Sequence, residues 1–253
     1  MSAPYYQDDL VTLFHGSYSD HLEEMVGADA ILTDPPYGET SLVWDRWPNG
    51  WPSDLATVSN SLWCFGSFRM FMDNLPDFKA WKFSHEIVWE KHNGSGFAAD
   101  KFRRVHELAT FWYRGEWGSI RHTVLTTPDA VKRTMRRKER PPHMGEIAGS
   151  QYVSEDGGDR LMRSVLKVRS EHGRAVHPTQ KPLGIVTPLI EYSVPVGGLV
   201  VDPFSGSGTT LLAAKLAGRR GIGCEINEAY CEAAARRLSQ QAFNFGDMEK
   251  VND

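Results

Sequence analysis

The sequence predicts an α/β fold whose sheet is mostly parallel and carries helices on both faces. Apolar runs of strand length alternate with helical patterns along the 253 residues, which is the order expected of β-α-β units. Two of these runs end in Asp-Pro, at Asp34 and at Asp202, and the second is followed by a glycine-rich turn. Because ligands bind at the carboxyl ends of strands in open parallel sheets, both Asp-Pro motifs are candidates for one site.

The first half of the chain predicts five strands and two helices. We expect strands at residues 11–14, 30–33, 61–65, 85–89 and 107–113, and helices at residues 21–25 and 68–75. The run at 30–33 is apolar enough to be buried. Pro35 and Pro36 lack the N–H donor of a strand, so residues 34–37 must leave the sheet as a stiff loop.

A tryptophan-rich segment follows this loop. It contains Trp44, Trp47 and Trp51 and is interrupted by Pro48 and Pro52, which predicts irregular structure. Two interpretations stay open: the segment covers the site, or it forms a small hydrophobic cluster of its own.

The last part of the chain continues the alternation of helices and strands. We expect helices at residues 182–192, 209–216 and 227–241, and strands at residues 199–202 and 221–224. Regular patterning fades in the segment that precedes them, which is rich in Gly, Pro and basic residues. We therefore expect residues 1–114 and 175–253 to be two halves of one domain, with residues 115–174 inserted between them.

Positive charge is concentrated in the inserted segment. The whole chain has a net charge of −4, but the stretch from Lys101 to Arg174 holds 16 Lys and Arg against 9 Asp and Glu. The densest part predicts contacts with the phosphates of a polyanion, the alternative being an ordinary solvated surface. The residues expected to make these contacts are Lys132, Arg133, Arg136, Arg137 and Lys138.

Several classes of protein are disfavoured by what the sequence lacks. The three cysteines, Cys64, Cys224 and Cys231, have no metal-ligand spacing and are odd in number, so we expect neither a disulfide framework nor a metal site. No run of ~20 apolar residues and no signal-peptide pattern is present. We therefore expect a cytoplasmic protein; the family resemblance described below implies that it is bacterial or phage-encoded.

The glycine-rich turn after Asp202 predicts a nucleoside-type cofactor. Glu225 follows Gly206 by 19 residues, the spacing at which an acid accepts hydrogen bonds from ribose hydroxyls. A phosphate-binding loop is disfavoured because Gly-Lys-Ser/Thr is missing, and a dinucleotide because Asp202 would repel a pyrophosphate. S-adenosylmethionine, which has a sulfonium, an ammonium and no phosphate, fits best. A tight turn without any ligand is the alternative.

Together these motifs resemble the β class of DNA amino-methyltransferases, the N6-adenine and N4-cytosine DNA methylase family. Asp-Pro-Pro-Tyr at 34–37, the basic insert and Phe-Ser-Gly-Ser-Gly at 204–208 occur in the permuted order of that class. Further similar segments lie at residues 87–91, 106–107 and 177–182. The resemblance implies a Rossmann-like, circularly permuted S-adenosylmethionine-dependent methyltransferase fold with a seven-stranded sheet. It also implies that the insert is the target-recognition region between a catalytic half and a cofactor-binding half.

The resemblance assigns roles to individual residues. The catalytic residues would be Asp34, Pro35, Pro36 and Tyr37. The cofactor would be bound by Ser17, Lys181, Asp202, Pro203, Phe204, Ser205, Gly206, Ser207, Gly208, Thr209, Glu225 and Ile226. Within this set Lys181 would contact the carboxylate of the cofactor. Ser17 stands where the family usually has an acid and would contact the cofactor's adenine.

The implied reaction is direct, in-line methyl transfer to the N6 amine of an adenine that is flipped out of double-stranded DNA. Asp34 and the carbonyl of Pro35 would accept hydrogen bonds from the amine, while Tyr37 stacks on the base. Cytosine C5 methylation is excluded because no cysteine follows a proline. Cytosine N4 methylation, protein glutamine methylation and a catalytically decayed DNA-binding module stay open. A homodimer is expected from the resemblance.

Overall fold

The computed structural model describes residues 3–41, 45–95, 100–137, 150–171 and 180–240. Its main sheet has nine strands in the described part of the chain, in the order β1-β2-β13-β12-β3-β4-β6-β5-β11. Their bounds are β1 Tyr6–Gln7, β2 Val11–His15, β3 Ala30–Thr33, β4 Ser61–Gly66, β5 Lys82–Ser95, β6 Arg104–Tyr113, β11 Val165–Lys167, β12 Leu199–Asp202 and β13 Arg220–Glu225. The α-helices are α1 Leu22–Met25, α2 Trp51–Asp54, α3 Phe68–Asn74, α4 Leu183–Ser193, α5 Thr209–Leu216 and α6 Glu228–Gln240. Short 3-10 helices lie at η1 Tyr18–His21, η2 Leu55–Thr57, η3 Leu75–Phe78 and η4 Trp117–Ser119.

The sheet confirms the predicted mostly parallel α/β fold. Strands β2, β13, β12, β3 and β4 are parallel to one another, and β6 runs antiparallel between β4 and β5. These seven strands are the predicted ones. The sheet is larger than expected because β1 and β11 extend its edges, one antiparallel and one parallel. Both have only two or three residues, which is too short to show a periodic pattern in the sequence.

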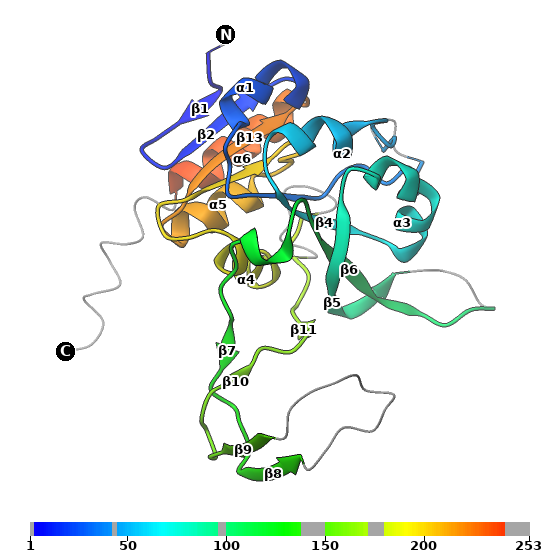
Figure 1. Ribbon diagram of the computed structural model, residues 1–253. Helices are drawn as coiled ribbons and strands as arrows, with labels where there is room; N and C mark the ends of the chain where they lie inside the picture. Colours follow the sequence, from blue (N-terminus) through cyan, green and yellow to red (C-terminus); the bar gives the residue numbers. More distant parts are fainter. Residues whose placement is uncertain (1–2, 42–44, 96–99, 138–149, 172–179, 241–253) are drawn as a thin grey trace. The chain divides into compact units, whose positions relative to one another are not determined.

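Helices cover both faces of the sheet, as the buried strands require (Figure 1). In β3, Ala30 and Leu32 pack in the cluster that contains residues of α4 and α5, whereas Ile31 packs in the cluster with α1 and α3. Since successive side chains of a strand point to opposite faces, a strand buried on both sides must be apolar throughout. All four residues of β3 and all six of β4 are buried.

The two Asp-Pro strands are direct neighbours. Strand β12 pairs in parallel with β3, with Val200 opposite Ala30 and Val201 opposite Ile31. Parallel neighbours end at the same edge of the sheet, so Asp34 and Asp202 leave it on the same side. This arrangement places the two sequence motifs at one site.

The inserted segment contains a separate compact unit at residues 124–163. It holds two small antiparallel sheets, β7 Thr126–Thr127 with β10 Arg160–Leu161, and β8 Arg133–Arg137 with β9 Ser150–Ser154. Within the expected insert of 115–174, η4 and β11 belong to the main unit. The segment was also expected to lack regular structure. The sequence did not predict its strands, because they are short and rich in charged residues and show no apolar alternation.

The tryptophan-rich segment is part of the core and is not wholly irregular. Trp51 begins α2, with Pro52 in the first turn, where a missing N–H costs nothing. Its side chain is fully buried beside Phe204, with the ring centroids 5.6 Å apart. Trp47 packs against the same cluster, and Trp44 lies outside the described residues. Of the two interpretations, hydrophobic packing holds for Trp47 and Trp51.

The described residues also bear on the expectations for cysteines, metal ligands and membrane spans. All three cysteines are free and buried. Within the described ranges, no group of three or more His, Cys, Asp or Glu side chains is placed to hold a metal ion. No described helix is both long and apolar enough to cross a membrane.

Candidate active site

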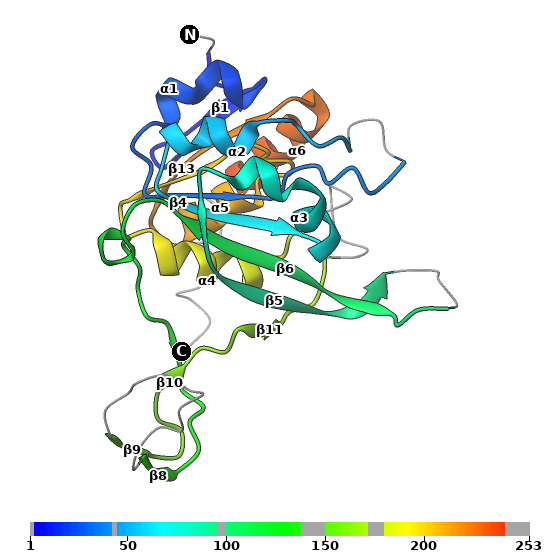
Figure 2. The same ribbon diagram turned by 45° about the vertical axis from the view of Figure 1, so that its right-hand side comes forward.

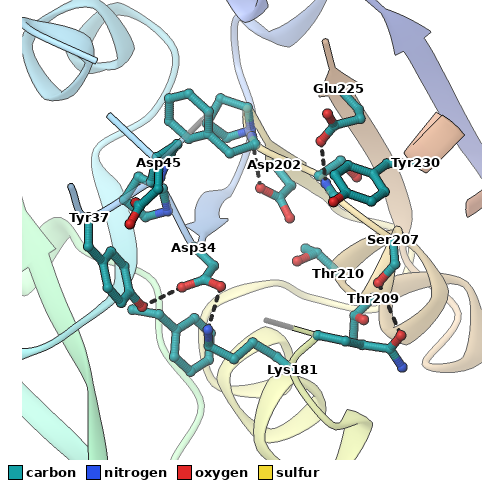
Figure 3. Close-up of a pocket in the computed structure, with 18 of the residues that line it drawn as sticks. Asp34, Tyr37, Asp45, Lys181, Asp202, Ser207, Thr209, Thr210, Glu225 and Tyr230 are labelled. Atoms are coloured by element: carbon teal, nitrogen blue, oxygen red, sulfur yellow. Dashed lines mark hydrogen bonds and ion pairs between the residues drawn. The ribbon is translucent and has the colours of Figure 1, made fainter. Parts of the chain in front are cut away.

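A cavity of about 1430 Å³ opens at the carboxyl ends of β3, β12 and β13. Residues of the Asp-Pro-Pro-Tyr loop line one part of it, and residues of the glycine-rich turn line another (Figure 3). Apart from Gly208, every residue that the sequence assigned to catalysis or cofactor binding lines this cavity. Gly208 does not line the cavity but packs against α6, where an added Cβ would come within 3.0 Å of the Cβ of Ala234.

Asp34 is held by a network of buried charged side chains. Its two carboxylate oxygens accept hydrogen bonds from the hydroxyl of Tyr37 and from Nζ of Lys181 (Figure 3). The same ammonium lies 2.9 Å from Oε1 of Glu107, whose other oxygen is 2.5 Å from Nζ of Lys91. Two carboxylates and two ammonium groups therefore balance in charge. This pairing is what allows four ionisable side chains to lie together in a largely buried place.

The network shifts the pKa values of Asp34, Glu107 and Lys181. Burial raises the pKa of Asp34, which the Lys181 ammonium opposes and Glu107 reinforces. Glu107 is also buried, but the two lysines outweigh this and lower its pKa to about 2. Burial favours neutral Lys181, yet the two carboxylates prevail and raise its pKa. Lys181 thus stays charged and is the main group that opposes the rise in the pKa of Asp34.

The position of Lys181 differs from the expected one at the cofactor's carboxylate. Its side chain is 7% exposed, and its ammonium is bound to Asp34 and Glu107. Two largely buried carboxylates need a cation nearby, and the Lys181 ammonium pairs with both of them. Lys181 therefore lies beside the Asp-Pro-Pro-Tyr loop, although it precedes the strands β12 and β13 in the sequence.

The glycine-rich turn and Glu225 form the second part of the site. Gly206 and Gly208 adopt positive φ angles of 50° and 73°, which glycine accepts without strain. Oε2 of Glu225 accepts a 2.8 Å hydrogen bond from the N–H of Gly206, and Oε1 accepts one from the N–H of Asn227. The acid is thereby locked to the turn at the end of β13. Burial raises the pKa of its carboxyl.

Asp202 lies between the two parts of the site. Its Oδ1 accepts hydrogen bonds from the hydroxyl of Thr33 at 2.9 Å and from the N–H of Phe204 at 3.2 Å. The residue is 4% exposed, and burial raises its pKa to about 6 even though these bonds oppose the shift. A carboxylate that is so poorly hydrated favours a cationic ligand in the cavity.

The buried Asp202 carboxylate predicts a pH dependence of stability. Its pKa of about 6 lies above the ordinary 3.8, so the folded state binds more protons and stability falls as pH rises through this window. Between pH 5 and pH 8, we expect the free energy of unfolding to fall by about 1 kcal/mol more in the wild type than in Asp202→Asn. Denaturant titrations at both pH values test this. An equal fall in both proteins would contradict it.

Ser205 shows that the turn can accept a polar ligand. Its hydroxyl oxygen is buried without a hydrogen-bond partner, one of two such side-chain atoms in the described part of the chain, and the residue lines the cavity. Buried hydroxyls are normally satisfied, so an orphan at the cavity wall indicates a group that a ligand supplies. Together with Glu225 and Asp202, this donor set fits a ligand with ribose hydroxyls and a positive charge.

The remaining predicted residues lie at the rim of the cavity. Ser17 caps η1 by accepting a hydrogen bond from the N–H of Ser19, and it lines the cavity. Ile226 is 68% exposed there, an unusual position for a large apolar side chain that has no ligand to cover. Phe204 packs its ring against Tyr18 and Trp51 and anchors the turn to the core.

Several residues that build the site were not predicted. Lys91 and Glu107 lie in segments noted for family similarity, but their pairing needs the register of β5 on β6, which brings Glu107 opposite Trp89. Asp45 is buried and accepts hydrogen bonds from the N–H groups of Gly38 and Thr40, which shapes the loop after Tyr37. No local sequence signal distinguishes Asp45 from a surface acid.

A protein-family comparison identifies the chain. A family profile described as a DNA methylase, the N6/N4 methyltransferase family, matches residues 28–236. That range holds both motifs and most of the chain. The chain belongs to this family and is a DNA methyltransferase of the N6/N4 type.

Individual relatives agree with this family. The type II methyltransferase M.ScaI of Streptomyces caespitosus is 26% identical over 274 residues, covering 96% of this chain and 86% of the relative. The crystal structure of the M1.HpyAVI-SAM complex has a TM-score of 0.60 at 24% identity, covering 90% of this chain and all of that one. The cytosine-N4-specific PvuII DNA methyltransferase has a TM-score of 0.64 at 14% identity, covering 93% and 88%. The two structural likenesses show that the fold is shared.

Proposed function

We propose that this DNA methyltransferase methylates the N6 amine of adenine in a base flipped out of double-stranded DNA. S-adenosylmethionine is the cofactor and supplies an electrophilic methyl group when it is bound. One observation carries the proposal: the Asp34 carboxylate, the Asp202 carboxylate and the glycine-rich turn line a single cavity. An acceptor for an amine and a place for a cationic methyl donor are thus side by side.

The residues of the chain have separate roles in this proposal. Asp34 accepts a hydrogen bond from the target amine and stabilises the positive charge that develops on its nitrogen. Tyr37 and Lys181 hold the two oxygens of that carboxylate in place, so its orientation is set before the base arrives. Glu225, Ser205 and the turn bind the cofactor. In this scheme Lys181 is a positioning residue.

The acid at position 34 favours adenine over cytosine as the target base. Within the β class, Asp rather than Ser at this position is typical of the adenine enzymes. The cytosine-N4 alternative keeps the same site and mechanism. Plasmid DNA from a methylase-free host that expresses this protein, read by sequencing that detects modified bases, tests the choice. Methylated adenines within one recurring motif are expected. Methylated cytosines in their place would overturn the base assignment.

Two other functions are less well supported. A protein glutamine methyltransferase would have Asn in the position of Asp34, and the basic segment would have no purpose. A decayed DNA-binding module would have no reason to keep four balanced buried charges beside an intact turn. Binding of S-adenosylmethionine measured by calorimetry separates an enzyme from a decayed module.

We further propose that the strand β8 and the residue before it bind DNA phosphates. Lys132 and Arg133 are exposed, and Lys132 lies 3.3 Å from Glu155, a surface pair that costs little to exchange for a phosphate. For Arg136 and Arg137 the structure describes the backbone in β8, and Lys138 lies outside the described residues.

Salt dependence of DNA binding tests this proposal. In a double variant of Lys132→Gln and Arg133→Gln, we expect the negative slope of log affinity against log salt concentration to become shallower by about 2. Each lost phosphate contact removes about 1 from its magnitude. Fluorescence anisotropy at several salt concentrations gives the slope. Unchanged slopes would remove this part of the chain from the DNA interface.

A further inference from the structure

Strands β5 and β6 continue beyond the sheet as a two-stranded ribbon. Strand β4 accompanies β6 only as far as Leu108, and β11 accompanies β5 only as far as Glu90. The pairing of β5 with β6 goes on to Ser95 and Arg104. Both views show the two strands running together past the end of β4 (Figures 1 and 2). We call the described residues 91–95 and 100–106 the ribbon; residues 100–103 directly precede β6 and are not themselves in a strand.

The ribbon starts at the active site. Lys91, at its base, binds Glu107, which is linked through Lys181 to the catalytic Asp34. Lys91 and Arg103 both line the cavity. The ribbon therefore borders the cavity.

The ribbon carries exposed apolar side chains together with basic ones. Phe102 is fully exposed, with a relative accessibility of 103%, and Val105 is 38% exposed. An aromatic ring left in water contributes no burial energy to folding, so Phe102 is available to gain that energy by packing against a ligand. Lys101, Arg103 and Arg104 give this stretch a positive charge, against one acid at Asp100.

We propose that the ribbon is a DNA-contacting arm, in which Phe102 packs against the base stack beside the flipped base and Lys101 contacts a phosphate. The proposal rests on the proposed function, because it needs DNA at the mouth of the cavity. Removing a base from the duplex leaves a gap in the stack, and apolar side chains commonly fill or widen such steps. A two-stranded ribbon also has the width that the major groove admits.

Site-specific cross-linking tests contact without knowledge of the recognition sequence. p-Benzoylphenylalanine is introduced at position 102 in the full-length protein, and at position 83 as the control. Phe83 is also an exposed phenylalanine, 50% accessible, but it lies at the opposite end of β5. With sheared, unmethylated bacterial DNA and ultraviolet light, we expect several-fold more DNA adduct at position 102 than at position 83. Equal labelling at the two positions would overturn the proposal.

Binding measurements give a second readout. We expect Phe102→Ala to weaken DNA binding about tenfold, as for the loss of one aromatic stack on a base, and Phe102→Trp to restore it. Phe83→Ala should bind as the wild type does. Thermal melts and S-adenosylmethionine binding should be unchanged in Phe102→Ala, because Phe102 has no packed neighbour to lose. Wild-type DNA affinity in Phe102→Ala would contradict the arm.

The outcomes separate the arm from the enzyme activity. Cross-linking of DNA by the protein with p-benzoylphenylalanine at position 102, combined with no base methylation by the wild-type protein, would contradict the proposed function and support the arm. Wild-type protein that methylates DNA, with no excess label at position 102 and no loss of affinity in Phe102→Ala, would overturn the arm alone.

Discussion

Replacement of Asp34 with alanine is expected to lower kcat about a thousandfold or more while S-adenosylmethionine still binds. The carboxylate is the acceptor that orients the amine and stabilises its developing charge, and its two oxygens are held by Tyr37 and Lys181. The cofactor residues Glu225 and Ser205 are untouched by the change. Single-turnover assays give the rate, and calorimetry gives the cofactor affinity.

A matched control is Asp73→Ala, which removes an exposed acid that pairs with the nearby Arg69. This variant should keep wild-type rates and cofactor affinity. Retention of full activity in Asp34→Ala would contradict the catalytic assignment. Loss of both S-adenosylmethionine binding and activity would show that Asp34 acts in cofactor binding instead.

Replacement of Lys181 with methionine is expected to move the acidic limb of the pH-rate profile upward by about one pH unit or more. The ammonium opposes the rise in the pKa of Asp34, so its removal lets that pKa rise further, and a higher pH is then needed to ionise the carboxylate. We also expect a lower melting temperature, because Glu107 and Asp34 lose the cation between them. Lys181→Arg should restore much of the profile.

The same variant distinguishes two roles for Lys181. A lysine that binds the cofactor's carboxylate would raise the dissociation constant of S-adenosylmethionine on removal and leave the pH limb in place. Removal of a positioning lysine would leave the dissociation constant of S-adenosylmethionine unchanged and would move the acidic limb of the pH-rate profile. Lys79→Met, which removes an exposed lysine, serves as the control. An unshifted limb with weaker cofactor binding would contradict the role that the structure indicates.

Much of the fold could be predicted because its strands are buried on both faces. Strands β3, β4 and β12 are apolar at every position or nearly so, which local sequence shows directly. The edge strands and the strands of the 124–163 unit could not be predicted, since two to five residues without a buried face carry no periodic signal. Trp51 was hard to place for a different reason. Its burial depends on packing against Phe204, which is distant in the sequence.

The site was predictable only where its chemistry is local. Asp34 and Glu225 each stand at the end of an apolar run, and that position in an α/β chain predicts a ligand contact. The partner of Lys181 could not be found in this way, because Asp34 is 147 residues away in the chain. Lys91 and Glu107 meet only through the register of β5 on β6. Side chains that act through other side chains leave little trace in the local pattern.

The most direct test of the central claim is mass spectrometry of nucleosides from DNA incubated with the protein and S-adenosylmethionine that carries a trideuterated methyl group. Unmethylated DNA of diverse sequence is the substrate, and Asp34→Ala is run in parallel. We predict trideuteromethyl-N6-deoxyadenosine with the wild-type protein and none with the variant. The absence of labelled methyl on any exocyclic amine, with cofactor binding demonstrated separately, would contradict the assignment of Asp34 and its cavity to DNA amino-methyl transfer.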